Sequence, residues 1–245
     1  MDSAKDNLVS YASKFDTKQV RFANRLYLFL AGLFITALIT CNLIANKFIS
    51  VDLGFKTFII SAGVLPYPIT FLITDILSEI YGKKKTDLVV YVGFFCSLFV
   101  LLILWLAHEF NSVDFSPVSD KYYNVVFQNS WRVILASMIA YLSAQLVDIR
   151  LYHFWKRLTG GKMLWLRNNG STIFSQLVDT VLVVFVLFVG RLPFATMGNY
   201  IMDGWFFKVI CALSDTVFIY LVVGWIRARL KLRLGEEIVY DDGVI

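Results

Sequence analysis

Apolar residues are grouped along the chain in runs that are long enough to cross a lipid bilayer as helices. The first run, Leu26 to Asn46, contains no Asp, Glu, Lys or Arg, and a helix needs about 20 residues to cross the hydrocarbon core. Further runs lie at residues 58–81, 88–107, 133–149 and 205–226, and another follows Ser171 and ends near Val189. The pattern predicts an all-α, polytopic membrane protein with six transmembrane helices.

The polar segments around these runs suggest how the chain is divided. We expect residues 1–25 to form a cytoplasmic polar segment, residues 26–228 a six-helix transmembrane domain, and residues 229–245 a cytoplasmic polar tail. The second span contains Pro66 and Pro68. Proline removes a backbone donor and disfavours a straight helix, so we expect a kink or a break there. Broken helices at membrane depth occur where the freed carbonyls face protein or a cavity.

Composition and charge agree with a membrane protein. The chain is 58% hydrophobic and only 17% charged, whereas soluble domains are about 25% charged. Seventeen of the 23 Lys and Arg residues lie in segments that share one side of the predicted membrane, and four lie on the other side. Basic loops remain in the cytoplasm, so both termini are expected there. The positive charge therefore indicates topology, and we predict no nucleic-acid partner.

A stripe of polar residues begins the fifth span. Ser171, Ser175 and Asp179 are spaced four residues apart, and Thr172 and Gln176 lie beside them on the helix. A carboxylate inside a span costs about 2.5 to 3.5 kcal/mol on insertion scales, and it should face protein or a water-filled cavity. The stripe predicts either hydrogen bonds between helices or a path for a substrate or an ion.

Other polar residues within or beside the spans extend this candidate path. Asp215 lies near the middle of the sixth span, and Gln145 and Asp148 lie one turn apart at the end of the fourth. Glu79 can equally serve as an interfacial residue that pairs with a nearby lysine. The predicted substrate-binding residues are Asn42, Asn46, Asp75, Glu79, Gln145, Asp148, Arg167, Asn168, Gln176, Asp179 and Asp215.

The chain carries none of the common catalytic motifs. It has two histidines and lacks the zinc-protease, nucleophile-elbow and phosphate-loop patterns. Cys41, Cys96 and Cys211 each lie inside an apolar span, which predicts no disulfide. Catalysis by Asp179 and Asp215 within the membrane is the enzymatic alternative. We predict transport of a small polar solute, with no enzyme activity, no metal site and no cofactor.

Four segments carry a family resemblance: residues 67–75 (YPITFLITD), 79–84 (EIYGKK), 144–148 (AQLVD) and 164–179 (LWLRNNGSTIFSQLVD). Together they resemble the queuosine precursor transporter family, also called vitamin uptake transporters, over roughly residues 26–228. The resemblance implies six helices in a bacterial inner membrane. It also implies uptake of a 7-deazaguanine, either 7-cyano-7-deazaguanine or the base queuine, for salvage into the tRNA nucleoside queuosine.

The candidate residues suit such a ligand. A guanine-like base offers N1–H and an amine to one carboxylate, and O6 to an amide or basic donor. We hypothesise that Asp179 or Asp215 accepts this edge while Gln176 and Gln145 orient it, with the ring stacked on aromatic side chains. The main alternative is the substrate-binding membrane subunit of an ATP-driven vitamin importer. Protons as coupling ions and a homodimer both remain open.

Overall fold

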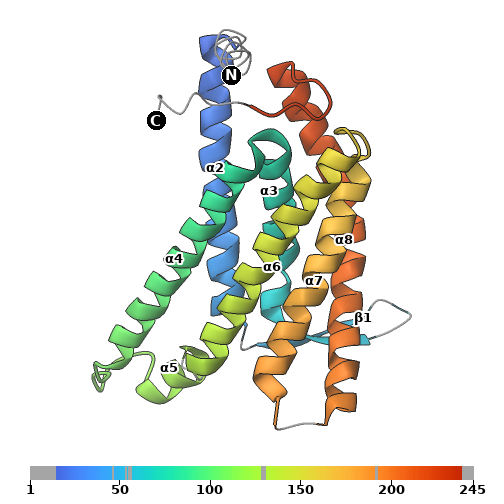
Figure 1. Ribbon diagram of the computed structural model, residues 1–245. Helices are drawn as coiled ribbons and strands as arrows, with labels where there is room; N and C mark the ends of the chain where they lie inside the picture. Colours follow the sequence, from blue (N-terminus) through green and yellow to red (C-terminus); the bar gives the residue numbers. More distant parts are fainter. Residues whose placement is uncertain are drawn as a thin grey trace, which may run out of the picture.

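The structure, a computed structural model, describes residues 15–45, 47–52, 54, 57–127, 131–190 and 193–238. Long helices form a bundle (Figure 1), and they are α2 (Thr17–Leu43), α3 (Tyr67–Ile80), α4 (Gly82–His108), α6 (Trp131–Leu158), α7 (Leu164–Phe188) and α8 (Phe194–Leu230). The shorter elements are strands β1 (Phe48–Asp52) and β2 (Thr57–Ser61), the 3-10 helix η1 (Ala62–Val64) and α5 (Asp120–Phe127).

The predicted class, an all-α polytopic membrane protein, is confirmed. Within the described residues, five helical segments are long and apolar enough to cross a membrane, and they are Thr17–Leu43, Ala62–Ile80, Gly82–His108, Leu164–Val186 and Phe194–Leu230. Helix α6 covers the fourth predicted span and has 28 residues. Its membrane crossing, and with it the count of six spans, stays a prediction.

The two ends of the bundle differ (Figure 1). The start of α2, the corner between α3 and α4, the turn between α6 and α7 and the end of α8 gather at one end, which we call the terminal end. The β-strands, α5, the end of α7 and the start of α8 lie at the opposite end, which we call the hairpin end. The antiparallel hairpin pairs Asp52 with Thr57, and it occupies sequence that was predicted as loop and as the start of the second span.

The second span therefore begins later than residue 58. Helix α3 starts at Tyr67, Pro66 is its N-cap residue and Pro68 is in the first turn. Proline is tolerated there because the first N–H groups of a helix have no partner within it. The two prolines thus lie where the chain passes from a 3-10 turn into α3.

Both polar flanks contain ordered structure. Helix α2 begins at Thr17, within the predicted polar segment, and the N–H of Asp16 donates to Gln19 Oε1 at 3.1 Å. After α8, the chain folds back until the N–H of Ile238 donates to the carbonyl of Ile80 at 2.7 Å. Residues 1–14 and 239–245 lie outside the described part. The tail up to Ile238 is therefore attached to the α3–α4 corner.

Helix α3 lies at the centre of the packing. Ten of its 14 residues are buried, and it contacts α2, α4, α6 and α8. By contrast, α4 and α8 carry exposed apolar side chains such as Phe95, Phe99 and Leu221, as expected of surfaces that face lipid. Burial of a polar group is costly unless it is hydrogen-bonded, so polar side chains on α3 need partners on the surrounding helices.

Candidate functional site

A column of buried polar side chains runs through the bundle along α3, α6 and α7. Its members recur at helical spacing, so that each helix turns one polar face inward. We call them the polar column, and they are Thr74, Asp75, Glu79, Gln145, Asp148, Arg167, Ser171, Thr172, Ser175, Gln176 and Asp179. The stripe predicted on the fifth span is thus buried inside the protein.

At the terminal end the column closes on Glu79, whose side chain is fully buried. Arg167 donates from Nη2 to Oε1 at 2.6 Å and from Nε to Oε2 at 3.0 Å. Arg227 also pairs with Oε1, Lys156 lies 3.4 Å from Oε2, and the Tyr152 hydroxyl donates to Oε2 at 3.0 Å. We call these five residues the Glu79 cluster. It connects α3, α6, α7 and α8 through one carboxylate.

The tail adds a further layer to this end. Glu237 accepts from Lys156 at 2.9 Å, and the backbones of Gly161 and Gly235 pass so closely that a Cβ on Gly161 would meet Gly235 Cα at 2.8 Å. Gly161 also has a positive φ of 75°. Glycine fits this crossing because it has no Cβ and adopts positive φ freely.

Arg167 and Asn168 precede Ser171, after which the fifth span was expected to begin, but the structure places both inside a helix. Helix α7 begins at Leu164, well before Ser171. Arg167 is 1% exposed and also donates to the carbonyls of Gly161 and Lys162. The polarity of this segment reflects partners on neighbouring helices instead of solvent.

In the middle of the column, Asp75 and Asp148 approach each other from α3 and α6. They are 1% and 0% exposed, and their carboxyl groups lie within hydrogen-bonding reach of each other. Ser175 donates to Asp148 Oδ1 at 2.8 Å, and Thr172 lies 3.5 Å from Asp75 Oδ2. The remaining oxygens, Asp75 Oδ1 and Asp148 Oδ2, are buried without a hydrogen-bond partner among the described residues.

Gln145 lies one helical turn from Asp148 on α6, on the side of the cavity-lining residue Tyr141. Its Oε1 accepts from the Thr74 hydroxyl at 3.2 Å, and its Nε2 donates to the Tyr141 hydroxyl at 2.8 Å. Both ends of the amide are therefore used, and Gln145 lies behind Tyr141, which lines a large cavity. Gln145 stabilises the wall of the cavity and does not itself line it.

The cavity has a volume of about 510 Å³. Its lining comes from α2, β2, η1, the start of α3, α4, α5, α6, α7 and α8. It includes Cys41, Asn42, Ser61, Tyr67, Phe94, Ser97, Phe127, Ser137, Tyr141, Asp179 and Lys208. These elements place it toward the hairpin end (Figure 1). A space of this size is within the range of small-molecule sites.

A charged and aromatic group forms one wall of the cavity. Lys208 Nζ lies 2.5 Å from Asp179 Oδ2 and 4.5 Å from the centre of the Tyr67 ring. The rings of Tyr67 and Tyr141 are 5.5 Å apart in an edge-to-face arrangement. Lys208 was not among the predicted site residues. It lies inside α8, which starts at Phe194 instead of the predicted Trp205, so it contacts Asp179 at membrane depth.

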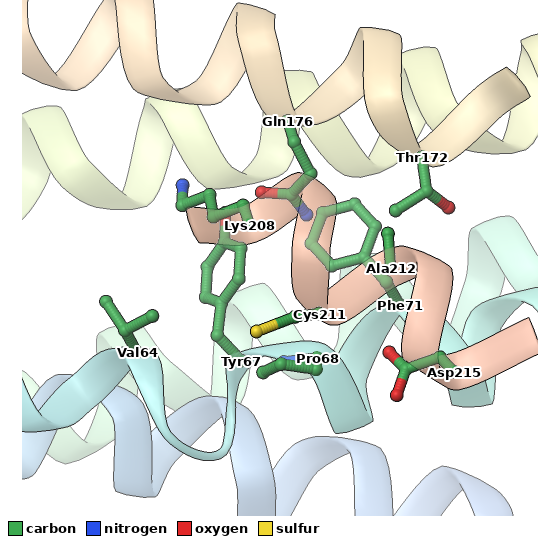
Figure 2. A pocket seen from close by; sticks show the side chains of 10 residues that line it. All are labelled: Val64, Tyr67, Pro68, Phe71, Thr172, Gln176, Lys208, Cys211, Ala212 and Asp215. Atoms are coloured by element: carbon green, nitrogen blue, oxygen red, sulfur yellow. The ribbon is translucent and has the colours of Figure 1, made fainter. Parts of the chain in front are cut away.

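A smaller pocket shares Val64, Tyr67 and Lys208 with the lining of the cavity. Figure 2 shows Gln176 and Thr172 pointing into it from α7, with Asp215 on α8 at its edge. Gln176 Oε1 is buried without a hydrogen-bond partner in the described chain. Asp215 is half buried, and it does not line the large cavity. The two carboxylates considered for base recognition are thus separated, and only Asp179 reaches the larger space.

The eleven predicted residues therefore fall into separate groups. Asn42 and Asp179 line the cavity, Gln176 and Asp215 the smaller pocket, and Asp75 and Asp148 form the central pair. Glu79 and Arg167 are bound to each other, Asn168 and Gln145 are buried nearby, and Asn46 lies outside the described residues.

A helical membrane bundle with buried ionisable residues and a cavity at membrane depth has the features of a solute transporter. Comparison with known proteins identifies the family. Residues 61–222, about two thirds of the chain, match the family described as "Putative vitamin uptake transporter". The chain belongs to this family.

Individual relatives agree with this assignment. The chain is 29% identical to a "Probable queuosine precursor transporter" of Bacillus subtilis, over 64% of this chain and 69% of the relative. It is 26% identical to a "Queuosine precursor transporter" of Escherichia coli, over 76% of this chain and 79% of the relative. No solved structure matches the chain significantly.

Proposed function

We propose that this protein carries a queuosine precursor, a 7-deazaguanine base such as 7-cyano-7-deazaguanine or queuine, into the bacterial cell across the inner membrane. The observation that carries the proposal is the cavity of about 510 Å³ with Asp179, Lys208 and two tyrosine rings in its wall. The names of the relatives support the choice of substrate.

The chemistry of the wall matches the base. A carboxylate can accept N1–H and the exocyclic amine of a guanine-like edge together, while an ammonium group can donate to O6. Asp179 and Lys208 supply these two groups side by side, 2.5 Å apart. Tyr67 and Tyr141 offer ring faces and edges, and stacking of a base on an aromatic ring contributes about 1 to 3 kcal/mol in nucleic-acid sites.

The orientation completes the proposal. Basic residues at the terminal end favour the cytoplasm for that end and for both termini, so the cavity would lie toward the outside. The Glu79 cluster would then close the cytoplasmic side, and release of the base inside would require this cluster to separate. A reporter fused after Ile245 should be active in the cytoplasm, and activity only outside the cytoplasm would reverse the orientation.

The central test is uptake of labelled 7-cyano-7-deazaguanine and queuine into cells that cannot make queuosine, read as modified tRNA. Expression of this chain should restore modification with at least one of the two bases. Asp179→Asn should weaken uptake, because the amide cannot accept two donors as a carboxylate does. Asp114→Asn is the matched control, since Asp114 is exposed in the α4–α5 loop, and it should transport normally.

Two outcomes would contradict parts of the proposal. If neither base is taken up, the substrate assignment is wrong. If purified Asp179→Asn binds the base as tightly as the unmodified protein, Asp179 does not recognise it. Transport by the chain alone in liposomes would exclude the ATP-driven importer subunit, whereas co-purification with an ATPase would favour it.

A further inference from the structure

Asp75 and Asp148 form an acidic pair that recognition of a neutral base does not use. Neither residue lines the cavity or the smaller pocket. Along the polar column they lie between Gln145, which hydrogen-bonds the cavity wall, and Glu79, which is one helical turn beyond Asp75 on α3. The pair therefore occupies the segment that separates the cavity from the closed terminal end.

The surroundings supply no cation to this pair. From α7 it meets the hydroxyls of Ser171, Thr172 and Ser175. Three further ionisable groups approach it, and they are Tyr152 on α6, Asp215 on α8 and Glu79 on α3. Glu79 is paired within its own cluster with three cations, Lys156, Arg167 and Arg227. Among the described residues, no Lys or Arg is within ion-pair distance of Asp75 or Asp148.

Within the described residues, the pair lacks a hydrogen-bond donor for two of its four carboxyl oxygens. Asp75 Oδ1 and Asp148 Oδ2 are both buried and have no partner in the described structure, although the two carboxyl groups are within hydrogen-bonding reach of each other. Ionised carboxylates are acceptors only, and two adjacent carboxylates in a buried site do not both stay ionised. A single shared proton supplies the missing donor and removes one of the two charges.

We propose that Asp75 and Asp148 together bind one transported proton, and that this proton enters the cell with the base. The inference rests on the proposed function and assigns its coupling ion. The proton comes from water in the cavity and leaves to water on the cytoplasmic side, so each neutral base is accompanied by one positive charge. Tyr141, Gln145 and Thr74 form a hydrogen-bonded connection from the cavity wall toward the pair.

The position of the pair explains how proton release would be tied to opening. Loss of the proton in the closed state would leave two uncompensated charges in a buried site, which is strongly unfavourable. Once the Glu79 cluster separates and water reaches the pair, this penalty falls and the proton can leave. Release of the proton therefore follows the same opening that releases the base.

The test uses purified full-length protein in liposomes with labelled 7-cyano-7-deazaguanine and the membrane potential held at zero. Two processes are measured: accumulation driven by an acidic exterior, and exchange of labelled for unlabelled base, which needs no net proton movement. One pH unit should drive about tenfold accumulation for one proton per base. Asp148→Asn and Asp75→Asn should lose this accumulation while still exchanging base, because asparagine resembles the protonated carboxyl group.

The control is Asp87→Asn, which removes a carboxylate that pairs with Lys83 at the start of α4, and it should retain both processes. Proton movement is also followed directly in the unmodified protein with a pH-sensitive dye, so the test does not depend on the variants folding. A base gradient should then drive protons in the same direction as the base.

The outcomes separate the two proposals. Absence of exchange by the unmodified protein would overturn the proposed function itself. Exchange without accumulation and without proton movement would overturn the proton site while leaving the transporter assignment in place. Accumulation by both asparagine variants equal to that of the unmodified protein would also overturn the assignment of the proton to this pair.

Discussion

Glu79→Gln should destabilise the protein strongly, because it leaves three cations around a neutral side chain. Glu79 is fully buried, and Arg167, Lys156 and Arg227 have side chains only 1%, 7% and 10% exposed. Glutamine keeps the volume and still accepts one hydrogen bond, so the main change is loss of charge. Removing one partner of a buried ion pair costs about 3 to 5 kcal/mol. That is a large share of the roughly 5 to 15 kcal/mol that stabilises a typical protein.

Thermal unfolding in detergent micelles, followed by circular dichroism, measures this effect. For a chain of this size, 1 kcal/mol corresponds to about 2 to 4 °C in Tm, so we expect a fall of about 6 to 20 °C. Glu237→Gln is the control, because its side chain is 35% exposed and pairs with Lys156 at the surface of the same cluster. Because Glu237 is in contact with solvent and Lys156 keeps Glu79 as a partner, loss of the Glu237 charge should lower Tm much less than loss of the Glu79 charge.

A second variant separates charge from packing. Adding Arg227→Gln to Glu79→Gln removes one of the uncompensated cations and should recover part of the lost stability, because deletion of both partners is milder than deletion of one. A Tm for Glu79→Gln equal to that of Glu237→Gln would refute the reasoning, since it would mean that the buried cations find solvent or other partners without cost.

Two further predictions concern packing and are tested by the same melting experiment. Gly93→Ala should destabilise the folded protein by about 1 to 3 kcal/mol through overpacking, because a Cβ at Gly93 would lie 2.7 Å from Phe34 Cε1. Gly32→Ala is the control and should leave Tm unchanged, because a Cβ there would have no neighbour within 4 Å in the described chain. Ile238→Ala should lower the free energy of unfolding by about 2 kcal/mol or more, because the Ile238 side chain is only 8% exposed and its N–H bonds the carbonyl of Ile80. An unchanged Tm would show that the tail does not stabilise the α3–α4 corner.

Periodicity was sufficient to predict the main features of the fold and part of the candidate site. The spacing of Ser171, Ser175 and Asp179 placed them on one helix face, and that face is buried. Asp179 and Asn42 line the cavity as candidate residues. The burial of that face could be predicted because the cost of a carboxylate in lipid is large enough to determine which way a helix face points. Binding of substrate by Asp179 and Asn42 stays a prediction.

The remaining features depend on contacts between distant segments. Arg167 appears polar and loop-like in sequence, but it is helical and buried, and Glu79, far away in the chain, accepts its hydrogen bonds. Lys208 lies near the start of the predicted sixth span, and the structure, in which α8 begins at Phe194, places it beside Asp179. The hairpin was missed because a short apolar run before Pro66 does not distinguish a strand from the first turns of a helix.

The Glu79 cluster also has a consequence for how the protein is made. Its carboxylate leaves the ribosome about 150 residues before Arg227, and at roughly 5 to 20 residues per second this interval lasts about 7 to 30 s. During that time α3 must enter the bilayer with a charge whose partners on α6, α7 and α8 are made one after another. Assembly of this end is therefore completed only after the last helix has been inserted.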